Sequence, residues 1–321
     1  MSASIISKFS QPNPATSSSV HPRLEFAVHY AALAPTGIKL RPWEIRLVDT
    51  HFELMMKEDP VLEAIDPDRR ESTIGCGAAL LYLKLALKHF GWFGRVAVFP
   101  DFNHPRRVAC IYPGTCCERD APSRLLFEAM QGSRVRAWSG DETAVTAPLL
   151  AALAGAAAGE RGWLDFVQSE VSRRRVIEIT LASEQNAVTA DIAHDRQTEL
   201  RPRSFFPFGG RRNGAGKLRL GPMREVSVPP TTLAVVKTKT DDKHGWLAAG
   251  QTMARAILQA QALDLSWAFV NQVRRPGARE ALRLGVGHKG FAQVILRFGS
   301  IAGTETMHVS KPLTVSVSAS C

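Results

Sequence analysis

Residues 77–91, GAALLYLKLALKHFG, decide the fold because a stretch in the second half of the chain repeats their pattern. GQTMARAILQAQALD, residues 250–264, aligns with them without a gap: each stretch starts at a glycine and carries Leu85 or Leu258 eight residues later. The apolar spacing predicts a buried helix in both stretches. Each is preceded by a charged loop and followed by a strand-like segment. We therefore predict two copies of one fold within a single chain.

The segments around the first helix predict an α+β unit. The apolar spacing favours a helix over 21–33 and a hairpin over 43–56, and two further strands are expected after Gly91. Lys84 and Lys88 are four residues apart, which predicts that they lie together on one exposed edge of the central helix.

The second half has a similar order of elements. We predict a helix over 147–159, mostly helix over 160–182, a strand over 231–240, a helix over 241–267 and a strand over 291–299. The chain thus divides into a disordered arm, a first repeat and a second repeat, at 1–20, 21–120 and 121–321. The second repeat includes an excursion rich in glycine and arginine at 200–225, which is a candidate lid.

Composition and charge restrict the class of protein. Of the 321 residues, 45% are hydrophobic and 22% charged, as in soluble globular proteins. Neither an 18-residue apolar window nor a signal peptide is seen, which favours a cytoplasmic location without a membrane partner. The net charge of +10 favours an anionic partner, but the basic residues form no nucleic-acid-binding module, so we expect a phosphate-bearing small molecule. The five cysteines show no CxxC spacing, and no metal site is predicted.

The loop within AALAPTGIKLRPWEIRL, residues 31–47, is the strongest candidate for binding a ligand. A Pro-Thr-Gly break ends a helix, Lys39 and Arg41 follow, and Trp43 is predicted to anchor the far end in the core. Gly37 allows the backbone to come close to a flat ring. A cationic loop that is fixed at its far end is suited to lie along a cofactor.

This loop resembles a segment of the nitroreductase superfamily, in which APTGIKLRPW corresponds to APSxHNTQPW. Further segments match in the same order and narrow the resemblance to the two-repeat, Acg-type branch: 66–92, 126–138, the Asn-Gly turn within 211–222, 241–258 and 291–299. The resemblance spans nearly the whole chain after residue 20. It implies a nitroreductase-like α+β fold duplicated as a pseudo-dimer, with mixed or antiparallel sheets flanked by helices. It also implies one flavin mononucleotide (FMN) between the halves, with NAD(P)H as a candidate electron donor.

The resemblance further implies a set of FMN-binding residues, which are Pro35, Thr36, Gly37, Lys39 and Arg41 in the loop, Ser133, Arg134 and Arg136 in a phosphate clamp, Asn271 and Gln272 beside the ring, and Lys311 near the phosphate. Arginine suits this role because its guanidinium binds phosphate oxygens in a bidentate manner. No catalytic acid or base is assigned, because the cofactor itself performs the redox step.

The chain departs from the family pattern in the loop. Ile38, Lys39, Leu40 and Arg41 replace the family's His-Asn-Thr-Gln, so the amides that usually bond to the flavin ring are missing. The two cations either stabilise a reduced flavin or fill an abandoned site.

Three functions follow from these alternatives. We expect an FMN-dependent oxidoreductase that acts on a small organic substrate, as a monomeric pseudo-dimer or a homodimer. The alternatives are a non-catalytic protein that sequesters flavin in an occluded site, and a degenerate member that no longer binds FMN.

Overall fold

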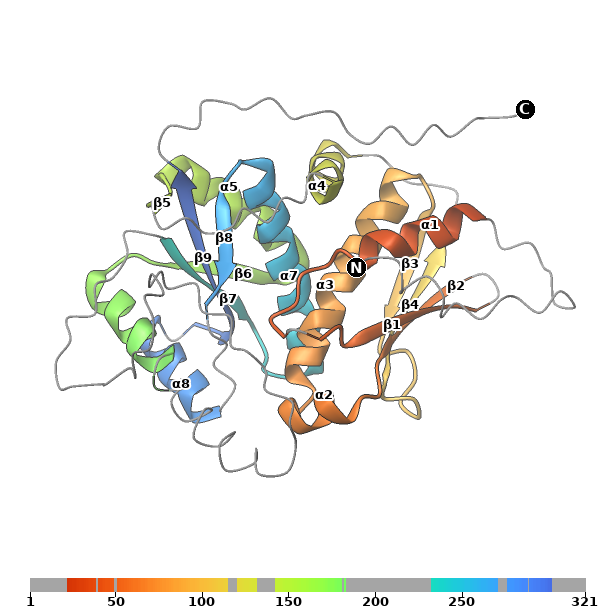
Figure 1. Ribbon diagram of the computed structural model, residues 1–321, viewed down its shortest axis with the longest axis horizontal. Helices are drawn as coiled ribbons and strands as arrows, with labels where there is room; N and C mark the ends of the chain where they lie inside the picture. The colour runs from red at the N-terminus through yellow and green to blue at the C-terminus, as the bar shows by residue number, and fades with distance from the viewer. Residues whose placement is uncertain are drawn as a thin grey trace, which may run out of the picture.

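The computed structural model describes residues 22–38, 40–48, 51–114, 120–131, 142–180, 182, 232–270, 276–287 and 289–301. Two antiparallel sheets lie on opposite sides of a central pair of long helices, α3 and α7 (Figure 1). The predicted α+β class is confirmed, and every strand pairing in the described part of the chain is antiparallel.

The first sheet follows the predicted order of elements. Its helices are α1 (Pro22–Ala31), α2 (Pro60–Ile65) and α3 (Arg70–His89), and its strands are β1 (Trp43–Val48), β2 (His51–Met56), β3 (Phe93–Val98) and β4 (Arg107–Pro113). The strands are arranged in the order β1-β2-β4-β3. The predicted hairpin is confirmed, with Val48 paired to His51 at its turn.

The second sheet contains β5 (Glu142–Thr143), β6 (Gly162–Val167), β7 (Thr232–Thr238), β8 (Ser266–Phe269) and β9 (Phe291–Ile301). Strand β7 lies between β6 and β9, and β9 also pairs with β8 and β5. The helices of this half are α4 (Ala121–Gln131), α5 (Ala147–Ala157), a 3-10 turn over Ala158–Glu160, a helix over 170–180, α7 (Lys243–Ala262) and α8 (Pro276–Gly285).

Several predicted boundaries were wrong. The segment 160–182 begins with strand β6, because residues 162–167 pair with β7, and only its later part is helical. The predicted helix over 241–267 ends at Ala262, and Trp267 lies in β8. Helices α2, α4 and α8 were not predicted. None of the described helices is both long enough and apolar enough to cross a bilayer.

The packing of α3 against α7 depends on two glycines. A Cβ added to Gly77 would lie 2.2 Å from the carbonyl oxygen of Leu247, and one added to Gly250 would lie 1.9 Å from that of Ile74. The two contacts are reciprocal, because Leu247 lies three residues before Gly250 and Ile74 lies three residues before Gly77. This reciprocal contact brings the two helix backbones together without intervening side chains.

Each long helix also covers a sheet. Phe52 and Leu54 of β2 belong to the same apolar core as the leucines of α3, and so do Ala234 and Val236 of β7. Leu233 and Val235 of β7 belong to a second apolar cluster, which includes Leu282 of α8. Helix α1 packs on α3, α5 packs on α7, and α4 contacts both long helices. The core therefore continues from one half of the chain into the other.

Candidate functional site

The candidate loop, residues 32–42, is fixed at its far end. Trp43 is buried in the core, as predicted, with 5% of its surface exposed. A Cβ on Gly75 of α3 would lie 2.8 Å from Pro42 Cγ and 3.3 Å from Trp43 Cζ3, so the Pro-Trp pair packs directly onto the helix. The amide of Lys57 donates to the Pro42 carbonyl at 2.9 Å. The loop is thereby tied to both α3 and the end of β2.

Four of the predicted flavin contacts lie in the described part of this loop. Pro35 and Thr36 are half-buried, whereas Gly37 and Arg41 are exposed. The Thr36 hydroxyl donates to the Ile38 carbonyl and closes a local turn.

Arg41 has a partner that was not anticipated. Its Nη2 donates to the Ala32 carbonyl at 3.0 Å, just beyond the end of α1. A cation at this position interacts favourably with the negative end of the helix. One role of Arg41 is therefore to hold the loop against α1.

The other predicted contacts, Lys39, Ser133, Arg134, Arg136, Asn271, Gln272 and Lys311, lie outside the described residues, as does the excursion at 200–225. Their roles stay predictions. The described residues bring together only the loop part of the predicted site.

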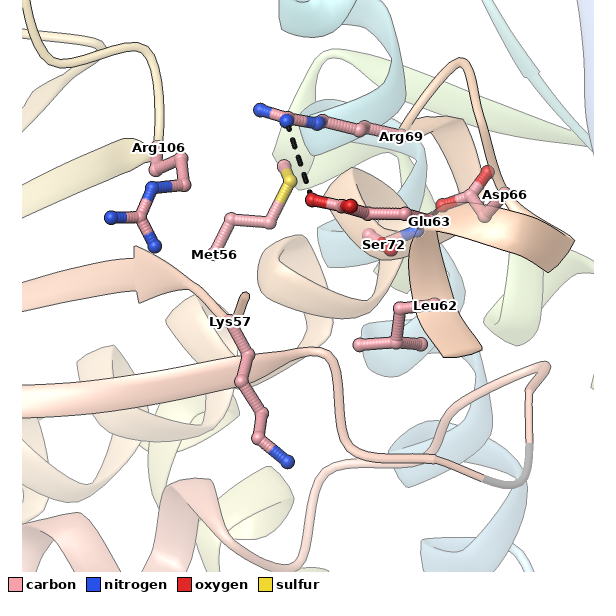
Figure 2. Close-up of a pocket in the computed structure, with 8 residues that line it drawn as sticks. All are labelled: Met56, Lys57, Leu62, Glu63, Asp66, Arg69, Ser72 and Arg106. Atoms are coloured by element: carbon pink, nitrogen blue, oxygen red, sulfur yellow. Dashed lines mark hydrogen bonds and ion pairs between the residues drawn. The ribbon is translucent and has the colours of Figure 1, made fainter. Parts of the chain in front are cut away.

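A surface pocket lies next to the point where Lys57 bonds to the loop. Figure 2 shows it between the end of β2, helix α2 and the start of α3. Its lining residues are Met56, Lys57, Leu62, Glu63, Asp66, Arg69, Ser72 and Arg106.

The cations of this pocket are paired with carboxylates. Arg69 lies 3.8 Å from Glu63, as the dashed line in Figure 2 marks, and Arg106 lies 2.8 Å from Glu58. Lys57 contacts Asp59 at 3.3 Å. With its charges balanced in this way, the pocket is a poor match for a phosphate group.

A buried polar network joins the start of α3 to the second half of the chain. Arg70, 3% exposed, donates to the backbone oxygen of Gln293 at 2.6 Å and to its Oε1 at 2.7 Å. It also pairs with Glu71. The Gln293 amide then donates to Thr238 Oγ1 at 3.0 Å and to Asp241 Oδ1 at 3.2 Å.

The electrostatics of this network are those of a structural clamp. Burial lowers the pKa of Arg70, and the Glu71 carboxylate opposes that shift. The network was missed because no sequence pattern indicates which residue of β9 a charge at the start of α3 will meet. It keeps the two halves aligned beside the candidate loop.

A second charged link corrects a sequence prediction. Lys84 was expected on an exposed edge of α3, but its Nζ lies 3.0 Å from Glu160 Oε2 and 3.0 Å from Gln251 Oε1. Glu160 also accepts from Arg255 of α7 at 2.8 Å. Lys84 faces α7 because the buried side of α3 is wider than a single apolar stripe.

Comparison with known proteins gives the family. No protein-family model matches the chain. Two Mycobacterium tuberculosis proteins, "Putative NAD(P)H nitroreductase Rv3131" from strain H37Rv and "Putative NAD(P)H nitroreductase MT3217" from strain CDC 1551, are 27% identical over 293 residues. The alignment covers 84% of this chain and 82% of each relative. This similarity supports the nitroreductase superfamily and, within it, the Acg-like family.

The same family is indicated by a shorter match. "Putative NAD(P)H nitroreductase acg" from the same organism is 34% identical over 88 residues, 27% of this chain. The resemblance inferred from the order of motifs is confirmed.

Proposed function

We propose that the chain is an FMN-dependent oxidoreductase of the nitroreductase type, with flavin held between its halves, NAD(P)H as electron donor and a small organic molecule as acceptor. The observation that carries the proposal is the similarity, over most of both chains, to proteins named NAD(P)H nitroreductases. The arrangement of the two sheets and the candidate loop supports the placement of one flavin between the halves.

The proposed duplication is supported by the matching topology of the halves. The first sheet has the order β1-β2-β4-β3, and the corresponding strands of the second give β6-β7-β9-β8. Helices α3 and α7 are both 20 residues long. The strands that follow them begin after the equally short connections 90–92 and 263–265. Together with the reciprocal glycine contact, these features favour a pseudo-two-fold axis between α3 and α7.

A difference between the halves supports a single flavin per chain. In the first half, residues 32–42 connect α1 to β1 and form the candidate loop. In the second half, only residues 158–161 separate α5 from β6, and 158–160 form a 3-10 turn. The segment that corresponds to the loop is therefore missing from the second half, so the pseudo-symmetry is expected to yield one complete site.

The described loop residues fit a polar planar ligand. Arg41 uses one nitrogen on Ala32, and a guanidinium has five N–H donors, so others remain for phosphate or ring carbonyl oxygens. Gly37 is exposed in the same loop. A bound flavin would supply the chemistry of accepting a hydride from nicotinamide and passing electrons to the acceptor. In this arrangement the chain positions the ring, and Arg41 offsets negative charge near it.

One observation favours the alternative that FMN is not bound. Arg41 already holds the end of α1, and Ile38, which replaces a polar family residue, is buried with 4% of its surface exposed. These roles suit a loop that has become structural. The two functions are separated by a direct test for flavin.

The first experiment is the visible absorption spectrum of the purified chain, followed by release and identification of any chromophore. We expect FMN at one molecule per chain, bleached by NADPH or NADH under anaerobic conditions. A colourless chain that takes up no added FMN would overturn the proposal. Bound FMN that neither nucleotide reduces would contradict the assigned electron donor and favour the sequestering function.

The predicted phosphate clamp has its own test. The double variant Arg134→Ala/Arg136→Ala should weaken FMN affinity at least about tenfold, since each tenfold corresponds to about 1.4 kcal/mol. A matched control removes the exposed arginines of two surface ion pairs, Arg124→Ala/Arg174→Ala, and should leave the affinity unchanged. Equal affinities in the two double variants would show that the clamp lies elsewhere.

A further inference from the structure

Four side chains form a compact block on the face of the first sheet that points away from α3. Phe52 of β2 belongs to the core, so its neighbours His51 and Glu53 point to the opposite face. Cys110 of β4 is paired in register with Glu53. The ring of Tyr112, also on β4, stacks on His51 with 5.1 Å between centroids and 21° between planes.

Three members of this block carry atoms that bind metal ions. One ring nitrogen of His51, one carboxylate oxygen of Glu53 and the sulfur of Cys110 all lie within 4.8 Å of one another. His51 Nε2 is 3.8 Å from Glu53 Oε1. Zinc binds imidazole, carboxylate and thiolate at about 2.0–2.3 Å, so ligand atoms of one site lie roughly 3–4 Å apart. The upper limit of 4.8 Å between the three atoms is only slightly longer than that spacing.

The thiol and the carboxylate of this cluster are almost fully shielded from solvent. Cys110 and Glu53 are 4% and 9% exposed, and Cys110 is a free thiol. Arg107 Nε lies 3.0 Å from Glu53 Oε1, but it is not aligned for a hydrogen bond. Both ion pairs of Glu53, with His51 and with Arg107, are made through Oε1. The carboxylate thus lies beside both the thiol and the imidazole.

We propose that His51, Glu53 and Cys110 form a binding site for one divalent cation of the zinc class, with a fourth position open to water. Imidazole and thiolate select such borderline cations over magnesium or calcium, which prefer oxygen ligands. The stacked Tyr112 ring would fix the imidazole plane, and Arg107 would orient the carboxylate, as outer groups do at known zinc sites. The sequence predicted no metal site because the ligands come from two strands and lack the usual short spacing.

The test uses the full chain, treated with a chelator and titrated with Co²⁺, a coloured substitute for Zn²⁺. We expect one Co²⁺ ion per chain and a thiolate-to-cobalt charge-transfer band. The band is measured as the difference between the spectra of the Co²⁺-loaded and the Zn²⁺-loaded chain, so that any flavin absorption cancels. Cys110→Ser should abolish the band and weaken Zn²⁺ affinity at least about tenfold. Cys76→Ala is the matched control, because Cys76 is a free cysteine buried in α3, and it should keep the band.

Two results would overturn the inference. The first is that no ion binds at one per chain; the second is that the band persists in Cys110→Ser, which would assign it to another cysteine. If circular dichroism shows that Cys110→Ser does not fold, His51→Gln provides the same test at a half-buried position. An unchanged Zn²⁺ affinity in His51→Gln would also overturn the site. All of these outcomes are independent of whether FMN binds.

Discussion

Replacing Gly250 with alanine sets two effects of opposite sign against each other. Gly250 lies in the middle of α7, where alanine would stabilise the helix by about 1 kcal/mol if nothing else changed. The new Cβ, however, would lie 1.9 Å from the Ile74 carbonyl oxygen and 2.9 Å from the Cα of Gly77. Both are backbone atoms, so a change of side-chain rotamer cannot relieve the contact.

The steric effect should be the larger one. The contact must open from 1.9 Å to beyond 3.0 Å, which separates the backbones of α3 and α7 by about 1 Å along most of their buried length. Overpacking of this kind costs about 1–3 kcal/mol, and a backbone obstacle places it at the upper end. After subtracting the gain in helix propensity, we expect Gly250→Ala to destabilise the chain by about 2 kcal/mol.

The assay is the urea midpoint of far-ultraviolet circular dichroism, compared at an unchanged slope. Gly77→Ala should shift the midpoint in the same direction, because its Cβ would lie 2.2 Å from the Leu247 carbonyl oxygen. Gly155→Ala is the matched control: Gly155 is exposed in α5 and no atom lies within 4 Å of an added Cβ, so alanine should stabilise by about 1 kcal/mol. The reasoning is refuted if Gly250→Ala raises the midpoint as Gly155→Ala does.

Two further predictions concern charged groups. The backbone hydrogen bond from Gly245 is the main cause that lowers the pKa of Asp242, the cap of α7, below its ordinary 3.8. Asp242→Ala should lower the free energy of unfolding by about 1 kcal/mol at pH 7. Urea midpoints should show that the difference from the unmodified chain shrinks as the pH falls below 3.8, because the Asp242 carboxylate is then protonated in the folded chain as well. Glu160→Ala should lower the free energy of unfolding by about 1.5–3 kcal/mol, because it leaves Lys84 and Arg255 without their shared carboxylate. In the same assay, the double variant Glu160→Ala/Lys84→Met should be more stable than Glu160→Ala alone, because it no longer leaves the Lys84 ammonium unpaired.

The sequence predicted the parts of the fold that depend on local pattern. The gapless alignment of 77–91 with 250–264 predicted two buried helices, and α3 and α7 are both long and largely buried. A buried helix requires a long apolar run, which is visible in the sequence, whereas the contact between Gly77 and Gly250 was not predicted. Burial of Trp43 was also predicted from the local sequence, in which this aromatic residue follows Pro42 at the end of the loop.

The features that sequence reasoning missed depend on partners far away in the chain. Arg70 and Lys237 are charged residues that a local reading places at the surface, yet they are 3% and 0% exposed. Lys237 is buried because Asp165 of β6 and two carbonyls after α8 surround its ammonium group, at 2.7–3.1 Å. Helices α2, α4 and α8 were missed because they are short, with 6, 11 and 10 residues. The three proposed zinc ligands likewise come together only through the pairing of β2 with β4.

The ends of the long helices bear on where a flavin phosphate could bind. A helix N-terminus attracts phosphate through its unpaired amides, but Asp66 already accepts from the amides of Glu71 and Ser72 at the start of α3, at 3.1 Å and 2.7 Å. Asp242 does the same at the start of α7, accepting from Gly245 at 2.8 Å. Each helix end therefore carries its own carboxylate, which would repel a phosphate. Phosphate binding would then depend on side-chain cations in loops, and this makes the arginine clamp a decisive part of the flavin proposal.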